Sequence, residues 1–139
     1  MRNIIIENEL IKYEVEDAII IATIKVSTLD IDLVKDFVDL RLKVTEKKDY
    51  PILINMKNTK KISKEARDFL ASEKGAERVI AAALIIDSML TATLANFFLK
   101  VNKPVVATRL FTNEEEAVKW LKTAKKDSPI DSAVPVKNF

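Results

Sequence analysis

The pattern of apolar and polar positions predicts a chain in which strands and helices alternate. Ile11, Tyr13 and Val15 alternate with charged residues, which is typical of a strand that is buried on one face only. Residues 3–6 either extend this strand or lead into it. Four later stretches are apolar over most of their length and predict core strands, and those at 18–26 and 79–86 are typical of strands that are covered on both faces. The four stretches are residues 18–26, 52–56, 79–86 and 104–110.

Apolar residues at helical spacing predict four helices between and after these strands. The helices are expected at 31–46, 64–74, 89–101 and 113–125. The first is capped within residues 27–30, and the second is capped by Ser63. Gly75 is expected to end the second helix in a left-handed conformation. Thr112 and Glu115 form a capping box for the last helix.

The order β-β-α-β-α-β-α-β-α predicts an α/β domain. We expect a mixed, mostly parallel sheet of about five strands, flanked by four helices. The first two strands form a hairpin, which contributes the antiparallel strand. Residues 1–126 form a single domain, and residues 127–139 form an extended C-terminal tail, because this stretch has two prolines and no helical pattern.

The composition excludes several kinds of chemistry. The 139 residues include no Cys and no His, so thiol nucleophiles, thiolate metal sites and His-based triads are excluded. Three consecutive glutamates at 114–116 point in different directions on a helix, so we expect no metal site and no cofactor. A net charge of +2, from 23 basic and 21 acidic residues, argues against nucleic-acid binding. We expect a cytoplasmic protein that is not an enzyme and has no membrane span.

Five local features together resemble the STAS fold, and more closely the SpoIIAA-like family. They are the strand at 18–25, YPILINMKN at 50–58, ISKEARDFLA at 62–71, the strand at 79–86 followed by Asp87-Ser88, and NKPVVATRLFTNEEEAVKWL at 102–121. The resemblance covers about residues 11–123. It implies the same α/β architecture, which is related to that of the CRAL-TRIO lipid-carrier domains, and a role in regulation through a partner protein.

The motif that defines the phosphorylated members of that family is altered in this sequence. STAS proteins that antagonise anti-sigma factors carry an Asp-Ser-Ser-Gly type motif after the third strand, and one of its serines is phosphorylated. Here Asn55 stands where those proteins usually have Asp, and Glu65 and Ala66 stand at the phosphoacceptor and glycine positions. The nearest hydroxyl belongs to Ser63, which is either a phosphorylation site or a helix cap.

Candidate binding residues gather where the strand at 52–56 ends. The basic loop and the helix start after it form a candidate edge for a partner or an anion, made of Asn55, Lys57, Lys60, Lys61, Ser63, Lys64 and Arg67. Neighbouring parallel strands end at the same edge of a sheet, which adds a candidate pocket edge of Asp87, Ser88, Thr91 and Arg109. Structural alternatives are strand termination by Asn55, helix capping by Ser63, Asp87 or Ser88, and an ion pair between Arg109 and one of the glutamates 114–116.

The predicted helix at 89–101 is apolar almost all round, which indicates a homodimer face, an apolar ligand cavity or deep burial. Our first hypothesis is a non-catalytic, STAS-like regulatory or protein-interaction module with an unidentified protein partner. The alternatives are a small carrier or sensor of an apolar or amphipathic ligand, and a phosphoswitch at Ser63.

Overall fold

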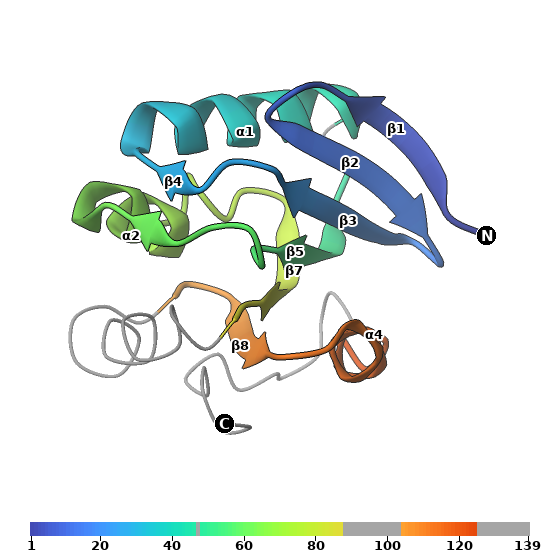
Figure 1. Ribbon diagram of the computed structural model, residues 1–139. Helices are drawn as coiled ribbons and strands as arrows, with labels where there is room; N and C mark the ends of the chain where they lie inside the picture. Colours follow the sequence, from blue (N-terminus) through green and yellow to red (C-terminus); the bar gives the residue numbers. More distant parts are fainter. Residues whose placement is uncertain (47, 88–103, 125–139) are drawn as a thin grey trace.

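One six-stranded sheet organises the protein (Figure 1). The computed structural model describes residues 1–46, 48–87 and 104–124. The strands of this sheet are β1 Asn3–Glu7, β2 Ile11–Glu16, β3 Ile19–Ile24, β5 Tyr50–Asn55, β7 Val79–Ile85 and β8 Ala107–Phe111. They lie in the order β1-β2-β3-β5-β7-β8; β2 pairs antiparallel with both β1 and β3, and β3, β5, β7 and β8 run parallel to one another. The predicted α/β class, with a mixed and mostly parallel sheet, is confirmed.

The sixth strand arises because Asn3–Glu7 pairs with β2 as a strand of its own. Its register shifts between Ile4 and Ile6, where the strand bulges. A bulge and charged neighbours interrupt the regular ladder that an edge strand would otherwise offer to another chain.

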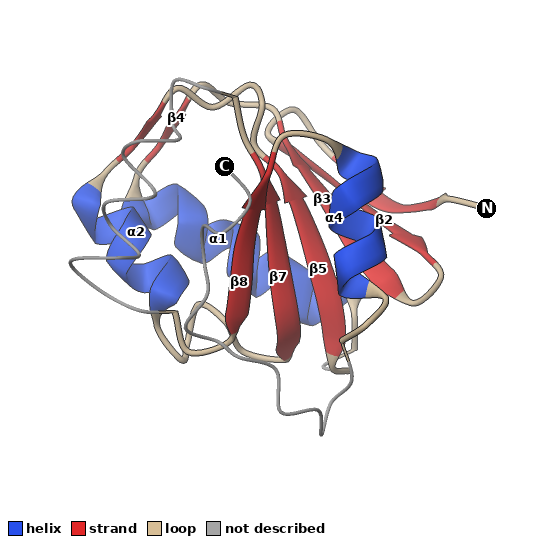
Figure 2. Ribbon diagram, turned by 90° about the horizontal axis from the view of Figure 1, so that it is seen from below, coloured by secondary structure: helices blue, strands red, loops and turns tan. Residues whose placement is uncertain are grey.

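The helices cover the two faces of the sheet unequally. The described part of the chain contains α1 Ile31–Val44, α2 Lys64–Ala71 and α4 Glu114–Leu121. Figure 2 shows α1 and α2 on one face and α4 on the other. The fourth predicted helix, at 89–101, lies outside the described residues, as do the homodimer face assigned to it and the tail at 127–139.

Alternation along the strands divides the core into two clusters. Ile20 and Ile52 point to the face under α1 and α2, whereas Ile21 and Leu53 point to the face under α4. Each of these four side chains is at most 4% exposed, so the central strands are covered on both faces, as their unbroken apolar pattern predicts.

A short parallel ladder lies beyond the ends of the parallel strands (Figure 2). It pairs β4 Thr28–Leu29 with β6 Lys61–Ile62. The backbone N–H of Lys60 also donates to the carbonyl oxygen of Ser27 at 2.7 Å. Two-residue strands are too short to produce a periodic pattern, so the sequence gives no signal for them. The ladder fixes the loop that leads from β5 to α2.

Two predicted helix boundaries are wrong. Gly75 does not adopt a left-handed conformation. A Cβ atom at this position would instead lie 2.0 Å from the carbonyl oxygen of Phe69, so the close approach of two backbone segments requires glycine. The cap of α4 is Asn113 rather than Thr112, because the Asn113 side chain accepts a hydrogen bond from the N–H of Glu116 at 2.9 Å.

The hairpin between β2 and β3 offers a direct test of backbone strain. Asp17 and Ala18 both have positive φ, 53° and 63°, between the paired residues Glu16 and Ile19. This is the two-residue turn that favours Asp-Gly, and alanine is strained there by about 1–2 kcal/mol. Glycine costs about 0.5–1 kcal/mol in chain entropy. We therefore expect Ala18→Gly to raise the free energy of unfolding by about 0.5–1 kcal/mol in urea titrations.

The matched control is Ala22→Gly, which lies in the extended, buried part of β3. It should lower the stability, because it loses side-chain contacts and relieves no strain. A loss of stability in both variants would contradict the strained turn.

Candidate functional site

The predicted candidate edge lies where β5 ends and where β6 and α2 begin. We call the surface formed by Asn55, Lys57, Lys60, Lys61, Ser63, Lys64 and Arg67 the basic edge. Asn55 terminates its strand by accepting a hydrogen bond from the N–H of Lys57 at 3.1 Å. Ser63 is the cap of α2, because its Oγ accepts from the N–H of Ala66 at 3.1 Å. The structural alternatives for both residues are thus confirmed, and phosphorylation of Ser63 stays a prediction.

Part of the basic edge is neutralised by the protein itself. The Nζ atom of Lys60 lies 2.7 Å from Oδ2 of Asp87, and that of Lys64 lies 3.0 Å from Oδ2 of Asp68. Arg67 donates from Nη1 to the carbonyl oxygen at the end of β6, at 2.7 Å. These three cations therefore hold local structure together, and a single bound anion that brings them together with Ser63 has no support in this arrangement.

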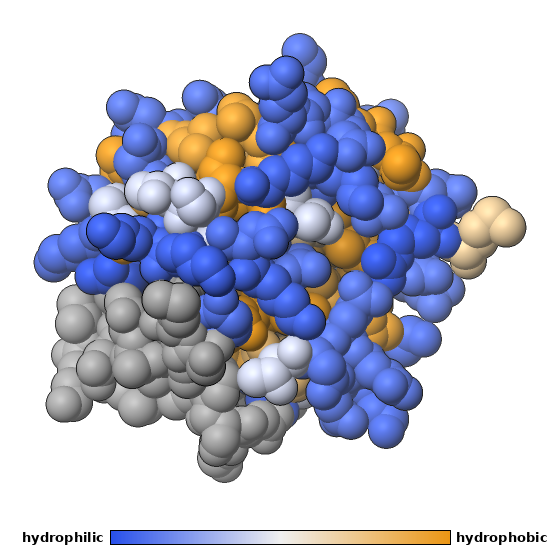
Figure 3. Space-filling view, in the orientation of Figure 1, coloured by the Kyte–Doolittle hydropathy of each residue, from blue (hydrophilic) through white to orange (hydrophobic). Residues whose placement is uncertain are grey.

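Lys57 and Lys61 differ from these three cations. Both are exposed, and no carboxylate of the described residues forms an ion pair with either. Lys61 also borders a surface hollow of about 410 Å³ that is formed by the β4–β6 ladder and the start of α2. On the face seen in Figure 3, mainly hydrophilic side chains cover the region of β4 and α2. The basic edge thus presents two available charges on a polar surface.

The predicted pocket edge is assembled only in part. Asp87 lies beside the basic edge as expected, whereas Ser88 and Thr91 lie outside the described residues. The predicted position of Arg109 at this pocket edge is wrong. It lies within β8 on the face that packs against α4, and its guanidinium is 5.5 Å from the ring centre of Trp120. The expected pair between Arg109 and a glutamate is also wrong, since Glu114 pairs with Arg2 at 2.6 Å instead.

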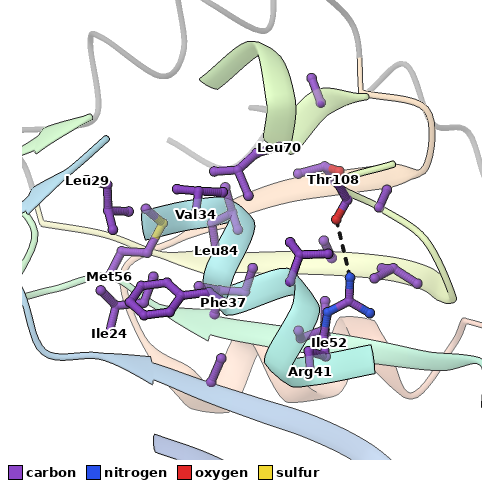
Figure 4. A pocket seen from close by; sticks show the side chains of 18 of the residues that line it. Ile24, Leu29, Val34, Phe37, Arg41, Ile52, Met56, Leu70, Leu84 and Thr108 are labelled. Carbon is purple, nitrogen blue, oxygen red and sulfur yellow. Dashed lines mark hydrogen bonds between the residues drawn. The ribbon is translucent and has the colours of Figure 1, made fainter. Parts of the chain in front are cut away.

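An apolar pocket lies on the opposite face of the sheet, beneath α1 and α2 (Figure 4); the sequence suggested an apolar cavity only at residues 89–101, which lie outside the described residues. We call it the interior pocket; its volume is about 90 Å³. Its apolar lining includes Ile11, Ala22, Ile24, Val34, Phe37, Ile52, Met56, Leu70, Ala82 and Leu84. Four side chains with polar atoms join them: Tyr13, Arg41, Arg67 and Thr108.

Arg41 is the main electrostatic feature of this pocket. It is only 3% exposed, and it belongs to the inner stripe of α1, seven residues after Val34 and four after Phe37. Its guanidinium donates to the carbonyl oxygens of Glu77 at 2.8 Å and of Gly75 at 3.3 Å. Burial lowers the pKa of Arg41, because it disfavours the charged form. The sequence feature that could have indicated this buried charge is an arginine within the apolar stripe of a helix.

The hydroxyl groups of the pocket are satisfied locally. Tyr13 donates to the carbonyl oxygen of Phe37 at 2.7 Å, and Thr108 donates to that of Val106 at 2.9 Å. Burial raises the pKa of Tyr13, because the phenolate would have to form away from water. These hydroxyls fix the walls of the pocket, and they leave Arg41 as its most deeply buried charge.

Other kinds of site find no support in the described residues. No three side chains of the Asp, Glu, Cys or His types lie close enough together there to hold a metal ion. No described helix combines the length and the apolar character that crossing a membrane requires.

Comparison with known proteins identifies the family and confirms the fold. The model of a family described as "Domain of unknown function (DUF7793)" matches residues 13–125, so the chain belongs to this family. The fold is similar to the crystal structure of an uncharacterized protein of the DUF3478 family, with a SpoIIAA-like fold, from Shewanella loihica PV-4. The TM-score is 0.56, with 17% identity over 87% of this chain and 95% of that one. The predicted SpoIIAA-like, STAS-type fold is thus confirmed, and at this identity the similarity speaks for the fold alone. No curated protein matches the sequence significantly.

The buried hydroxyl of Tyr13 predicts a loss of stability at alkaline pH. A tyrosine in the unfolded chain loses its proton near pH 10, whereas burial raises the pKa of Tyr13 in the folded chain. Its contribution to the free energy of unfolding is therefore complete below about pH 10 and is lost progressively above it. Tyr13→Phe should cost about 1 kcal/mol at neutral pH, because it removes the hydrogen bond to Phe37. Between about pH 10 and 11 its stability should decline less steeply than that of the wild type. Urea titrations at these pH values measure both effects, and equal slopes would contradict the raised pKa.

Proposed function

We propose that this DUF7793 domain is a non-catalytic, STAS-like regulatory module that binds an acidic surface of a partner protein through its basic edge. The observation that supports this role most is the availability of Lys57 and Lys61, which are exposed and have no ion-pair partner in the described part of the chain. Between residues 57 and 67 there are five basic residues and one acidic residue, although the whole chain has a net charge of only +2. An acidic partner surface complements such a local excess.

The basic edge is also held in shape before any partner arrives. The hydroxyl of Thr59, which is fully buried, donates to the carbonyl oxygen of Val26 at 3.0 Å. The backbone N–H of Ser63 donates to the carbonyl oxygen of Leu29 at 3.0 Å, next to the β4–β6 ladder. A loop that is already ordered loses little conformational entropy when it binds, which favours association.

Charge reversal tests this proposal. Lys57→Glu combined with Lys61→Glu should weaken the binding of the partner by roughly tenfold or more, because attraction is replaced by repulsion. The partner is captured from native cells with the wild-type domain as bait, and its affinity is then measured by titration with purified proteins. Wild-type binding should also weaken as salt is raised, since exposed charges are screened.

Lys43→Glu combined with Lys119→Glu is the matched control. Both lysines are exposed, and they lie on α1 and α4, away from the basic edge. The control carries the same change in net charge and should bind as the wild type does. Equal weakening by both pairs, or no weakening by either, would contradict a role of the basic edge.

The interior pocket supports a second candidate function, that of a carrier or sensor of a small apolar or amphipathic ligand. Small-molecule sites are concave and mainly apolar, with a few polar groups that orient the ligand. The pocket combines a lining of that kind with one deeply buried arginine. At about 90 Å³ it is smaller than typical drug-sized sites of about 300–1,000 Å³, so it suits a small molecule rather than a long lipid.

Mass spectrometry tests the second candidate. The protein is purified gently from native cells and is weighed under native and under denaturing conditions. A ligand should appear as added mass in the native spectrum and as a free small molecule after organic extraction. Ala82→Val, which adds two methyl groups inside the pocket, should lose this mass. A native mass equal to that of the bare chain, or a ligand that Ala82→Val retains, would contradict a role of the pocket.

A further inference from the structure

The chemical class of the ligand follows from the position of Arg41, and this inference rests on the second candidate function. The guanidinium of Arg41 is buried, and its partners are neutral: the carbonyl oxygens of Gly75 and Glu77 and, as Figure 4 shows, the hydroxyl of Thr108. No carboxylate of the described residues lies within ion-pair distance of it; the Glu77 side chain is exposed and acts on it only from further away. A buried cation is costly unless an anion or several hydrogen bonds compensate for it.

The guanidinium retains the capacity to bind an anion. Arginine carries five N–H donors in a planar fork; the bonds to Glu77 and Gly75 and the contact with Thr108 drawn in Figure 4 engage some of them and leave others for a ligand. A carboxylate fits such a fork with two parallel hydrogen bonds, which an ammonium group cannot offer. Figure 4 shows the Arg41 side chain in the wall of the pocket, with its guanidinium directed toward Thr108. A ligand of the interior pocket is therefore expected to carry a negatively charged group that contacts Arg41.

The apolar part of the pocket limits the rest of the ligand. A cavity of about 150 Å³ lined by aliphatic and aromatic side chains holds one benzene molecule, which has six carbon atoms. The interior pocket, at about 90 Å³, thus accommodates on the order of four carbon atoms without rearrangement. Side chains such as Val34, Ile52 and Leu84 offer this part no hydrogen bonds, so it must be apolar, and the volume is too small for a six-membered aromatic ring, which leaves a short aliphatic chain.

We propose that the interior pocket binds a short aliphatic carboxylate, with the carboxylate on the guanidinium of Arg41 and the alkyl chain among the apolar side chains beneath α1 and α2. Binding of this kind compensates for the buried charge and fills the apolar volume at the same time. Arg41 then selects the anion, and Ala82 sets the depth of the pocket, because a larger side chain there would occupy it.

Butyrate and its neutral isostere butyramide test this assignment on the wild-type protein. Both are titrated while the methyl NMR signals of Val34, Ile52 and Leu84 are followed, which separates binding in the pocket from binding to surface lysines. Butyrate should bind at least about tenfold more tightly than butyramide, because a charged hydrogen-bond pair is lost in the amide. Equal affinities, or butyrate shifts confined to the basic edge, would overturn the assignment of a carboxylate.

Three variants complete the test. Arg41→Met keeps an unbranched side chain of similar length and should remove the preference for butyrate, while Ala82→Val should abolish the binding of both compounds. Arg109→Met makes the same exchange on the opposite face of the sheet, beside Trp120, and should bind as the wild type does. If Arg41→Met fails to fold, Arg41→Lys retains the charge without the planar fork and should lose most of the preference for butyrate.

Xenon distinguishes failure of this inference from failure of the candidate function beneath it. Xenon is neutral and apolar, and its entry into the pocket shifts the same methyl signals. Xenon and butyramide that bind as well as butyrate would overturn the carboxylate assignment and leave a ligand pocket. No entry of xenon, butyrate or butyramide would overturn both.

Discussion

The buried guanidinium of Arg41 is the constraint around which the face of the sheet beneath α1 and α2 is built. Its two hydrogen bonds join α1 to the segment that leads from α2 into β7. That segment approaches α2 closely because Gly75 has no side chain, since a Cβ atom would collide with the carbonyl oxygen of Phe69. The glycine at position 75 therefore allows the carbonyl groups of Gly75 and Glu77 to reach the guanidinium of Arg41. Loss of these hydrogen bonds would leave the buried charge uncompensated, which is costly. The requirement to keep them therefore fixes α1 relative to the segment between α2 and β7.

The two faces of the sheet are packed differently. On the α4 face, Ala81 and Ala83 are fully buried, and together with Leu53 and Leu121 they fill the space beneath the helix. On the other face, the small side chain of Ala82 faces α1 and α2, and a volume of about 90 Å³ remains open. Proteins usually fill such volumes, because empty space forfeits dispersion contacts. An open apolar volume next to a buried cation is the observation on which the proposed ligand site rests.

The sequence predicts the architecture better than the chemistry, for physical reasons. The long apolar runs of β3, β5 and β7 identify buried parallel strands, and capping by Ser63 follows from local hydrogen bonding. The two-residue ladder of β4 and β6 leaves no periodic signal. Arg109 was misplaced because strand periodicity alone does not say which face of β8 it occupies, and the face under α4 offers the ring of Trp120. The interior pocket depends on long-range packing, which local patterns do not contain.

The two candidate functions involve different parts of the same domain. The basic edge lies beyond the ends of the parallel strands, and the interior pocket lies beneath α1 and α2; Ile62 of β6 and Arg67 of α2 line the pocket from the side of the basic edge. Helix α2 begins at the basic edge and ends beside the pocket, so occupancy of the pocket and shape of the edge share one element. If both proposals hold, this shared helix connects the ligand site to the partner surface.

The most direct measurement is a crystal structure of the protein soaked with a short aliphatic carboxylate that carries bromine at the end of its chain. Anomalous scattering locates the bromine without reference to any other density. We expect bromine among Val34, Ile52 and Leu84, with the carboxylate within hydrogen-bond distance of the Arg41 guanidinium. Bromine found only beside surface lysines, or a carboxylate directed away from Arg41, would contradict this expectation.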